Sequence, residues 1–108
     1  MSAEKIAQFL ALKEAHPQSE MPRWTLATTY AEAGRHEEAI AEFEGLVAMK
    51  PDYCVAYLHW GSSLLALDRP EDALTVLERA RELAIAQDHT APRQEAEMLI
   101  EAAREDLE

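Results

Sequence analysis

The chain has 108 residues, of which 48% are hydrophobic and three are glycine, and this balance indicates one globular, helix-rich domain rather than a disordered chain. Its formal net charge of −11, from 21 acidic and 10 basic residues, repels phosphate backbones and anionic lipid, so nucleic acid and membranes are not expected as partners. The sequence has neither a signal-peptide pattern nor a stretch of about 18 apolar residues, so we expect a cytoplasmic protein.

The first predicted helix covers 3–15, and Pro17 closes it. Its apolar side chains form one stripe, made of Ile6, Phe9, Leu10 and Leu12. The second helix begins after Ser19, a residue type that caps helix starts. It ends at Gly34, because glycine adopts the left-handed conformation that other residues avoid. A third helix is predicted over 36–49.

The fourth helix is predicted over 54–67, and it is apolar on nearly all sides. Asp68 and Glu71 form the capping-box signature of a fifth helix. No proline closes that helix, so we expect it to run to about Gln87. The sixth helix begins near Thr90 and continues to the end. The short connections make successive helices antiparallel neighbours, and no run alternates as a strand would.

The pattern of apolar residues repeats along the chain at a fixed spacing. Ile6 is as far from Ile40 in the sequence as Ile40 is from Leu74. The other buried and small positions that coincide at this period are Phe9, Phe43 and Leu77; Ala27 and Gly61; Ala39 and Ala73. Such a period is typical of stacked repeats, in which each unit buries its apolar face only against its neighbours. Small residues allow helices to approach closely, so we expect Gly61 to face Ala73.

The two central units resemble the tetratricopeptide repeat, a helix–turn–helix module with the same period. The residues with the family's spacing are Leu26, Ala27, Tyr30, Gly34, Ala39, Phe43 and Pro51 in the first unit, and Trp60, Gly61, Leu64, Ala73, Leu77 and Ala80 in the second. The resemblance implies an all-α fold, a right-handed superhelix of antiparallel helix pairs. Its expected units are a half repeat over 1–19, full repeats over 20–53 and 54–87, and a capping helix over 88–108. In that last helix Met98 stands at an aromatic position of the repeat, whereas the polar Gln94 and Glu95 suit a terminal cap.

In this family the first helices of successive repeats line a concave groove that holds an extended peptide or a partner helix. The residues carried over to that groove by position are Trp24, Thr25, Thr28, Leu58, His59, Ser62, Leu65 and Arg93. Tryptophan is enriched among residues that dominate binding, so we expect an apolar patch of Trp24, Leu58 and Leu65. Enclosure of the fourth helix by its neighbours is the alternative. The resemblance thus implies a protein-interaction adaptor that binds a protein or peptide, and the acidic surface and the apolar patch favour a basic or apolar partner.

Some members of the family hold an acidic carboxy-terminal tail with lysines, asparagines and an arginine. Here Trp24 and His89 stand at the lysine positions, and Thr28 and His59 at the asparagine positions. Only Arg93 fits, and the net charge of −11 opposes an acidic ligand, so we reject this function.

A self-assembling homo-oligomer is the alternative to an adaptor. The stripe available for such contacts on the sixth helix consists of Ala96, Leu99, Ile100, Ala103 and Leu107. Ordinary packing on the fifth helix is the other use of that stripe, and we favour it.

The sequence contains no pattern typical of catalysis or metal binding. Its four histidines are never three or four residues apart, so no helix presents paired ligands. Cys54, the single cysteine, has no histidine–aspartate arrangement nearby and suits a structural thiol. His59 and His89 would make binding depend on pH if they face the groove, although solvated histidines are the alternative. We therefore expect a protein that is not an enzyme and has no cofactor or metal.

Overall fold

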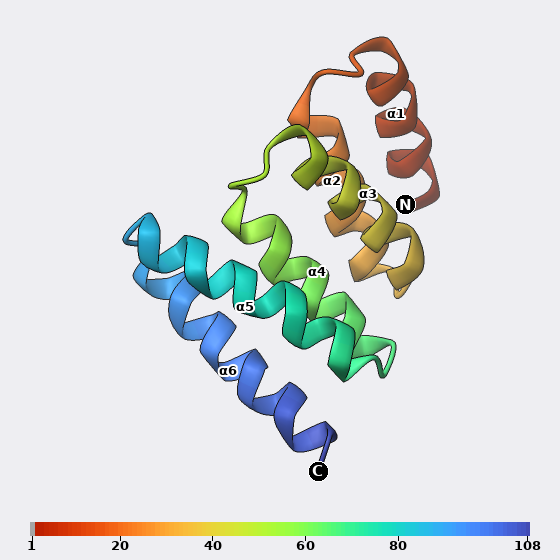
Figure 1. Ribbon diagram of the computed structural model, residues 1–108. Helices are drawn as coiled ribbons and strands as arrows, with labels where there is room; N and C mark the ends of the chain where they lie inside the picture. Colours follow the sequence, from red (N-terminus) through yellow and green to blue (C-terminus); the bar gives the residue numbers. More distant parts are fainter. Residues whose placement is uncertain (1) are drawn as a thin grey trace.

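The computed structural model describes residues 2–108, which form six α-helices joined by short turns. The helices are α1 (Ser2–Ala15), α2 (Glu20–Glu32), α3 (His36–Met49), α4 (Cys54–Ala66), α5 (Pro70–Ala86) and α6 (Thr90–Asp106). Figure 1 shows them arranged in chain order, with α1 at one end of the molecule and α6 at the other. No strand occurs in the described part, and the predicted all-α superhelix of helical repeats is confirmed.

Three of the turns close with a residue in the left-handed region: Gly34, Asp68 and Asp88, with φ of 77°, 58° and 57°. After α4, for example, the amide of Arg69 donates to the carbonyl of Leu64 over 2.9 Å, which satisfies a helix-end carbonyl. The predicted capping box at Asp68 is therefore wrong. Arg69 is the N-cap of α5 and makes no side-chain cap bond. Asp68 takes the place of a turn glycine instead, because aspartate tolerates the left-handed region better than most residues.

The core consists of three apolar clusters, of which the smallest contains Cys54, Leu83 and Ala84 and the two larger ones meet at Trp60. The N-terminal cluster contains Ile6, Leu26, Ala27, Tyr30, Ala39, Phe43, Leu46 and Ala56. The C-terminal cluster contains Ile40, Leu58, Leu64, Ala73, Val76, Leu77, Ala80, Ala96 and Ile100. A methyl group added to Gly61 would overlap the side chain of Leu77, so the absence of a side chain at this position permits a close approach to α5.

The N-terminal helix α1 is attached through a buried carboxylate. Glu42 of α3 is 7% exposed and accepts a hydrogen bond of 2.8 Å from the ammonium of Lys13 on α1. Nη1 of Arg23 on α2 lies 3.8 Å from the other carboxylate oxygen of Glu42. One negative charge thus joins three helices. The network is incompletely satisfied, because Oε1 of Glu42 and Nε of Arg23 are buried without a hydrogen-bond partner.

The C-terminal helix α6 is attached by apolar side chains. Ala96, Ile100 and Ala103 are buried, and α6 packs on both α5 and α4. Met98 is 67% exposed, so it is not packed in the core as the aromatic residue at this position of a repeat would be. It lies two residues from Ala96, which puts it on the opposite side of the helix. Three residues of the predicted stripe, Ala96, Ile100 and Ala103, are thus used within the chain, as in the interpretation we favoured, whereas Leu107 is 43% exposed.

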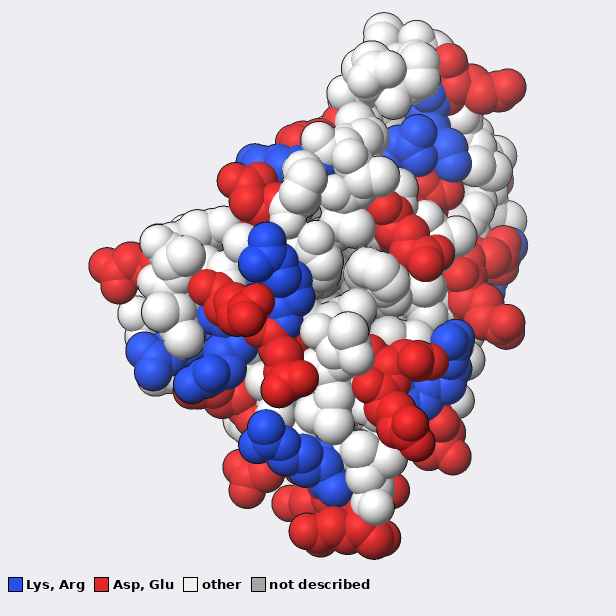
Figure 2. Space-filling model, in the orientation of Figure 1, with Lys and Arg blue, Asp and Glu red and all other residues white. Residues whose placement is uncertain are grey.

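Basic side chains on the surface are mostly engaged by acidic neighbours. Figure 2 shows acidic groups over much of the visible face, with basic groups beside them. Each of the seven arginines lies within 4.0 Å of a carboxylate. Several of these pairs join residues three positions apart at the start of a helix, such as Arg35 with Glu38 and Arg69 with Asp72.

Candidate functional site

The most concentrated group of aromatic side chains lies where α2, α3 and the start of α4 meet. We call Trp24, Phe43, Tyr53 and His59 the aromatic cluster. The half-buried Trp24 stacks on Tyr53 with ring centroids 5.7 Å apart, and His59 meets Trp24 edge-on at 5.2 Å. Phe43 lies beneath, 6.1 Å from the rings of both Trp24 and His59. The cluster joins the first helices of the two repeat units, because Trp24 is on α2 and His59 on α4.

The charges of two carboxylates act on this cluster. His59 is exposed to solvent in part, but burial desolvates the imidazole and lowers its pKa, while the negative charge of Glu95 on α6 acts in the opposite direction. Burial, and then the charge of Glu20 on α2, raises the pKa of Tyr53. A cation is also present, since the ammonium of Lys50 lies 5.3 Å from the centroid of the Tyr53 ring. The cluster is thus an aromatic surface on which two negative charges act.

The structure brings Trp24 and His59 together, as just described. Thr25 and Thr28 are half-buried on α2, and the hydroxyl of Thr28 donates to the carbonyl of Trp24 over 3.1 Å. Ser62 is exposed on α4. Leu65 is half-buried and packs against the C-terminal core cluster.

Two of the predicted groove residues lie elsewhere. Leu58 is 3% exposed and belongs to the same core cluster as Ala96 and Ile100, so it offers no open surface. The reason is the packing of α6 on α4, and for this residue the alternative of enclosure is correct. Arg93 donates to Glu97 over 3.4 Å and lies with Ile85 in a hollow between α5 and α6. It therefore faces the junction of these helices.

Sequence reasoning did not include Tyr53, Glu20 or Glu95 among the site residues. Tyr53 is the N-cap of α4, so it lies outside the helical periodicity from which the groove was predicted. Its residue type could have identified it. Small polar residues are preferred at N-caps, so a tyrosine at this position indicates a role other than capping. Glu20 and Glu95 look like ordinary solvated helix residues in the sequence, and only the tertiary fold brings them to the cluster.

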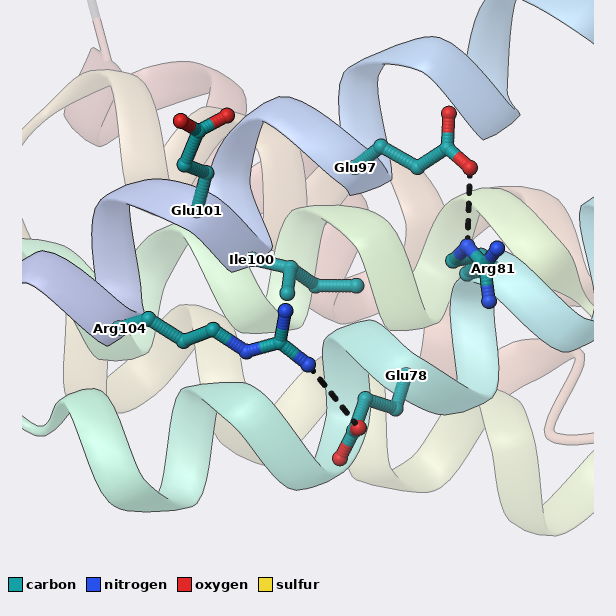
Figure 3. A pocket seen from close by; sticks show the side chains of 6 residues that line it. All are labelled: Glu78, Arg81, Glu97, Ile100, Glu101 and Arg104. Atoms are coloured by element: carbon teal, nitrogen blue, oxygen red, sulfur yellow. Dashed lines mark hydrogen bonds and ion pairs between the residues drawn. The ribbon is translucent and has the colours of Figure 1, made fainter.

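A hollow of about 580 Å³ lies between α5 and α6. Figure 3 shows Arg81 directed at Glu97 and Arg104 directed at Glu78, on either side of Ile100. The hydrogen bond from Arg81, and secondarily the one from Arg93, lowers the pKa of Glu97. Because these arginines are already paired, the hollow has no free cation to offer an anionic ligand.

The remaining chemistry is sparse. Cys54 is buried, its thiol donates to the carbonyl of Ala80 over 3.3 Å, and burial raises the pKa of the thiol. Within residues 2–108 no three histidine, cysteine or acidic side chains are grouped as a metal site would require. No helix in the described part combines the length and apolar character needed to cross a membrane.

Several solved structures have the same fold as this chain. PcrH in complex with the chaperone binding region of PopD superposes with a TM-score of 0.92 at 21% identity, over 99% of this chain and 81% of that one. The TPR2B domain of yeast Sti1, in its complex with pHsp70, gives 0.85 at 19% identity, over 93% and 80%. A tetratricopeptide repeat domain protein from Salinibacter ruber gives 0.72 at 29% identity, over 81% and 88%.

Among curated proteins, none matches the sequence significantly. The sequence model of the tetratricopeptide repeat matches twice, over 21–44 and 56–79. These segments contain most of α2 with the first part of α3, and most of α4 with the first part of α5. With the superhelix formed by all six helices, the two matches identify the chain as a member of the tetratricopeptide repeat family.

Proposed function

We propose that this protein is a non-catalytic interaction module that holds a peptide or helix of a partner protein against the first helices of its repeats, at the aromatic cluster. The observation that carries the proposal is Trp24, which is only half-buried although it stacks on Tyr53 and meets His59. Aromatic side chains that combine rigid packing with an open side are the usual anchors of protein interfaces.

The surface beside the cluster suits a partner segment. Ser62 is exposed and Leu65 half-exposed further along α4, so polar and apolar contacts alternate along this helix. Two structural relatives support the same use of the fold, since PcrH is bound to a region of PopD and the Sti1 domain to pHsp70. The α6 stripe of Ala96, Ile100 and Ala103 packs within the chain, so it gives no support to self-assembly.

Affinity capture from cells of the source organism tests the proposal, with the partners of each variant quantified by mass spectrometry. We expect Trp24→Leu and Ser62→Arg to lose the same set of partners. The first removes the aromatic anchor, and the second fills the surface without disturbing the core. Met98→Ala is the matched control, because Met98 is 67% exposed on the outer side of α6.

The folded state of each variant is checked by circular dichroism and urea unfolding. If folded Trp24→Leu and Ser62→Arg retain every partner that the wild-type protein retains, the aromatic cluster is not the binding surface.

A further inference from the structure

The charge balance of the surface indicates what the partner must carry. Six of the 21 acidic side chains pair with basic groups in the structure, and they engage all seven arginines and Lys13. Within residues 2–108, the other 15 acidic side chains make no ion pair. The protein therefore has unbalanced negative charge to offer a partner and almost no free positive charge.

The charges of two of the unpaired carboxylates act on the aromatic cluster. Glu20 lies one turn before Trp24 on α2, and its charge acts on Tyr53. The charge of Glu95 on α6 acts on His59. Lys50 already lies over the Tyr53 ring, which demonstrates that a cation can occupy an aromatic face at this place. Aromatic rings attract cations through their negative faces, and nearby carboxylates add to this attraction.

We propose that the partner segment is cationic, and that one of its arginine or lysine side chains stacks on the aromatic cluster, attracted by the negative charges of Glu20 and Glu95. This inference rests on the proposed function and names the chemical class of its ligand. An arginine suits the site best, because a guanidinium stacks on aromatic rings and donates to carboxylates in its own plane. An acidic segment would be repelled by the same carboxylates.

The test uses two short synthetic amphipathic peptides that differ at one central position, arginine in one and citrulline, its neutral isostere, in the other. Binding is followed by two-dimensional NMR of the labelled full chain, with the Trp24 indole and the His59 amide as reporters. We expect both signals to shift on titration, and the arginine peptide to bind about three- to thirtyfold more tightly than the citrulline peptide.

Matched carboxylate variants separate local recognition from general attraction to an acidic protein. The double variant Glu20→Gln with Glu95→Gln should lower the affinity for the arginine peptide about fivefold or more, because it removes two negative charges that act on the aromatic cluster. Glu4→Gln with Glu105→Gln changes the net charge equally, at exposed places on α1 and α6, and should have a much smaller effect. Lys50→Ala should strengthen binding, because it removes a competing cation from the Tyr53 ring.

The outcomes distinguish the two proposals. Equal affinities for the arginine and citrulline peptides, with shifts at Trp24 and His59, would overturn the cationic ligand and leave the proposed binding surface standing. Equal losses in the two pairs of carboxylate variants would also overturn it, because the attraction would then be non-specific. Shifts confined to α3 and α5 for both peptides would contradict the binding surface itself.

Discussion

The two ends of the superhelix are attached to its middle in different ways. At the N-terminal end, the backbone of α1 approaches only α2, and the side chain of Lys13 reaches the buried Glu42 on α3. At the C-terminal end, α6 packs on both α4 and α5 through Ile100 and two alanines, and its ion pairs with α5 are exposed.

This difference bears on stability, because apolar burial and buried charge behave differently under substitution. Apolar burial stabilises in proportion to the area removed from water. A buried ion pair mainly offsets its own desolvation, yet the loss of one partner leaves a buried charge uncompensated. We therefore expect α6 to be held by its core contacts, and α1 by Ile6 together with a charged network in which every member is required.

The largest effect is expected at the C-terminal end. Ile100→Ala should lower the free energy of unfolding by about 2–5 kcal/mol, because it leaves a cavity under α6 in the C-terminal core cluster. Urea unfolding measures this change. Met98→Ala, on the exposed side of the same helix, should change stability by less than about 0.5 kcal/mol. Equal effects of the two substitutions would show that α6 is not anchored by its inner stripe.

At the N-terminal end, Glu42→Ala should cost about 1–3 kcal/mol, since the substitution leaves Lys13 and Arg23 partly buried without their carboxylate. Hydrogen exchange should increase most in α1. Glu44→Ala, two residues along the same helix and exposed, is the control.

A compensated variant sharpens this result. Glu42→Met combined with Lys13→Met and Arg23→Met should recover much of the lost stability, because apolar groups of similar size can replace a buried group of paired charges. If Glu42→Ala and Glu44→Ala behave alike, the network does not hold α1.

The regular spacing of apolar residues made the fold predictable. The residues that depart from this spacing show which features cannot be predicted from the sequence alone. Ile6 and Ile40 coincide at the repeat period because each repeat buries the same positions, and both are buried. The inward face of α6 was predicted in large part, because the expected stripe includes Ala96, Ile100 and Ala103, which are buried. The repeat position of Met98 did not indicate its exposure, since a terminal helix has no further repeat to cover that side.

The candidate site was predictable only in part. Trp24 and His59 come together because the first helices of successive repeats lie near each other, and the two residues are one position apart in the repeat. Leu58 occupies a similar position but is covered by α6, which the sequence of α4 alone does not reveal. Tyr53 belongs to a turn, where its contact with Trp24, a residue far earlier in the sequence, depends on the tertiary fold.

A smaller effect should follow from the exposed ion pairs at the C-terminal end. Arg81→Gln removes the 2.9 Å pair with Glu97, and both side chains are about two-fifths exposed. Solvent screens such pairs, so the free energy of unfolding should fall by less than about 1 kcal/mol, and less still in 1 M salt. Urea unfolding at both salt concentrations measures it. A loss as large as that of Ile100→Ala would mean that charge, rather than apolar burial, holds α6.

The smallest effect on stability is expected from the titration of His59 on α4. Its ring contacts Trp24 and Phe43, and the charge of Glu95 on α6 acts on it. Desolvation by these neighbours lowers the pKa of His59 in the folded chain below its ordinary value of 6.5. The unfolded chain then binds a proton at higher pH than the folded chain, so stability falls as the pH drops below about 6.5. This loss is limited, because Glu95 opposes the effect of desolvation.

The stability difference between pH 7.5 and 5.5, measured by urea unfolding, should be smaller in His59→Asn than in wild type. His16→Asn, in the exposed turn before α2, should leave it unchanged. Glu95→Gln removes the charge that favours the imidazolium, so it should lower the pKa of His59 further and increase the loss at pH 5.5. No change in the pH dependence on Glu95→Gln would mean that α6 does not reach His59, and that the C-terminal end is separate from the aromatic cluster.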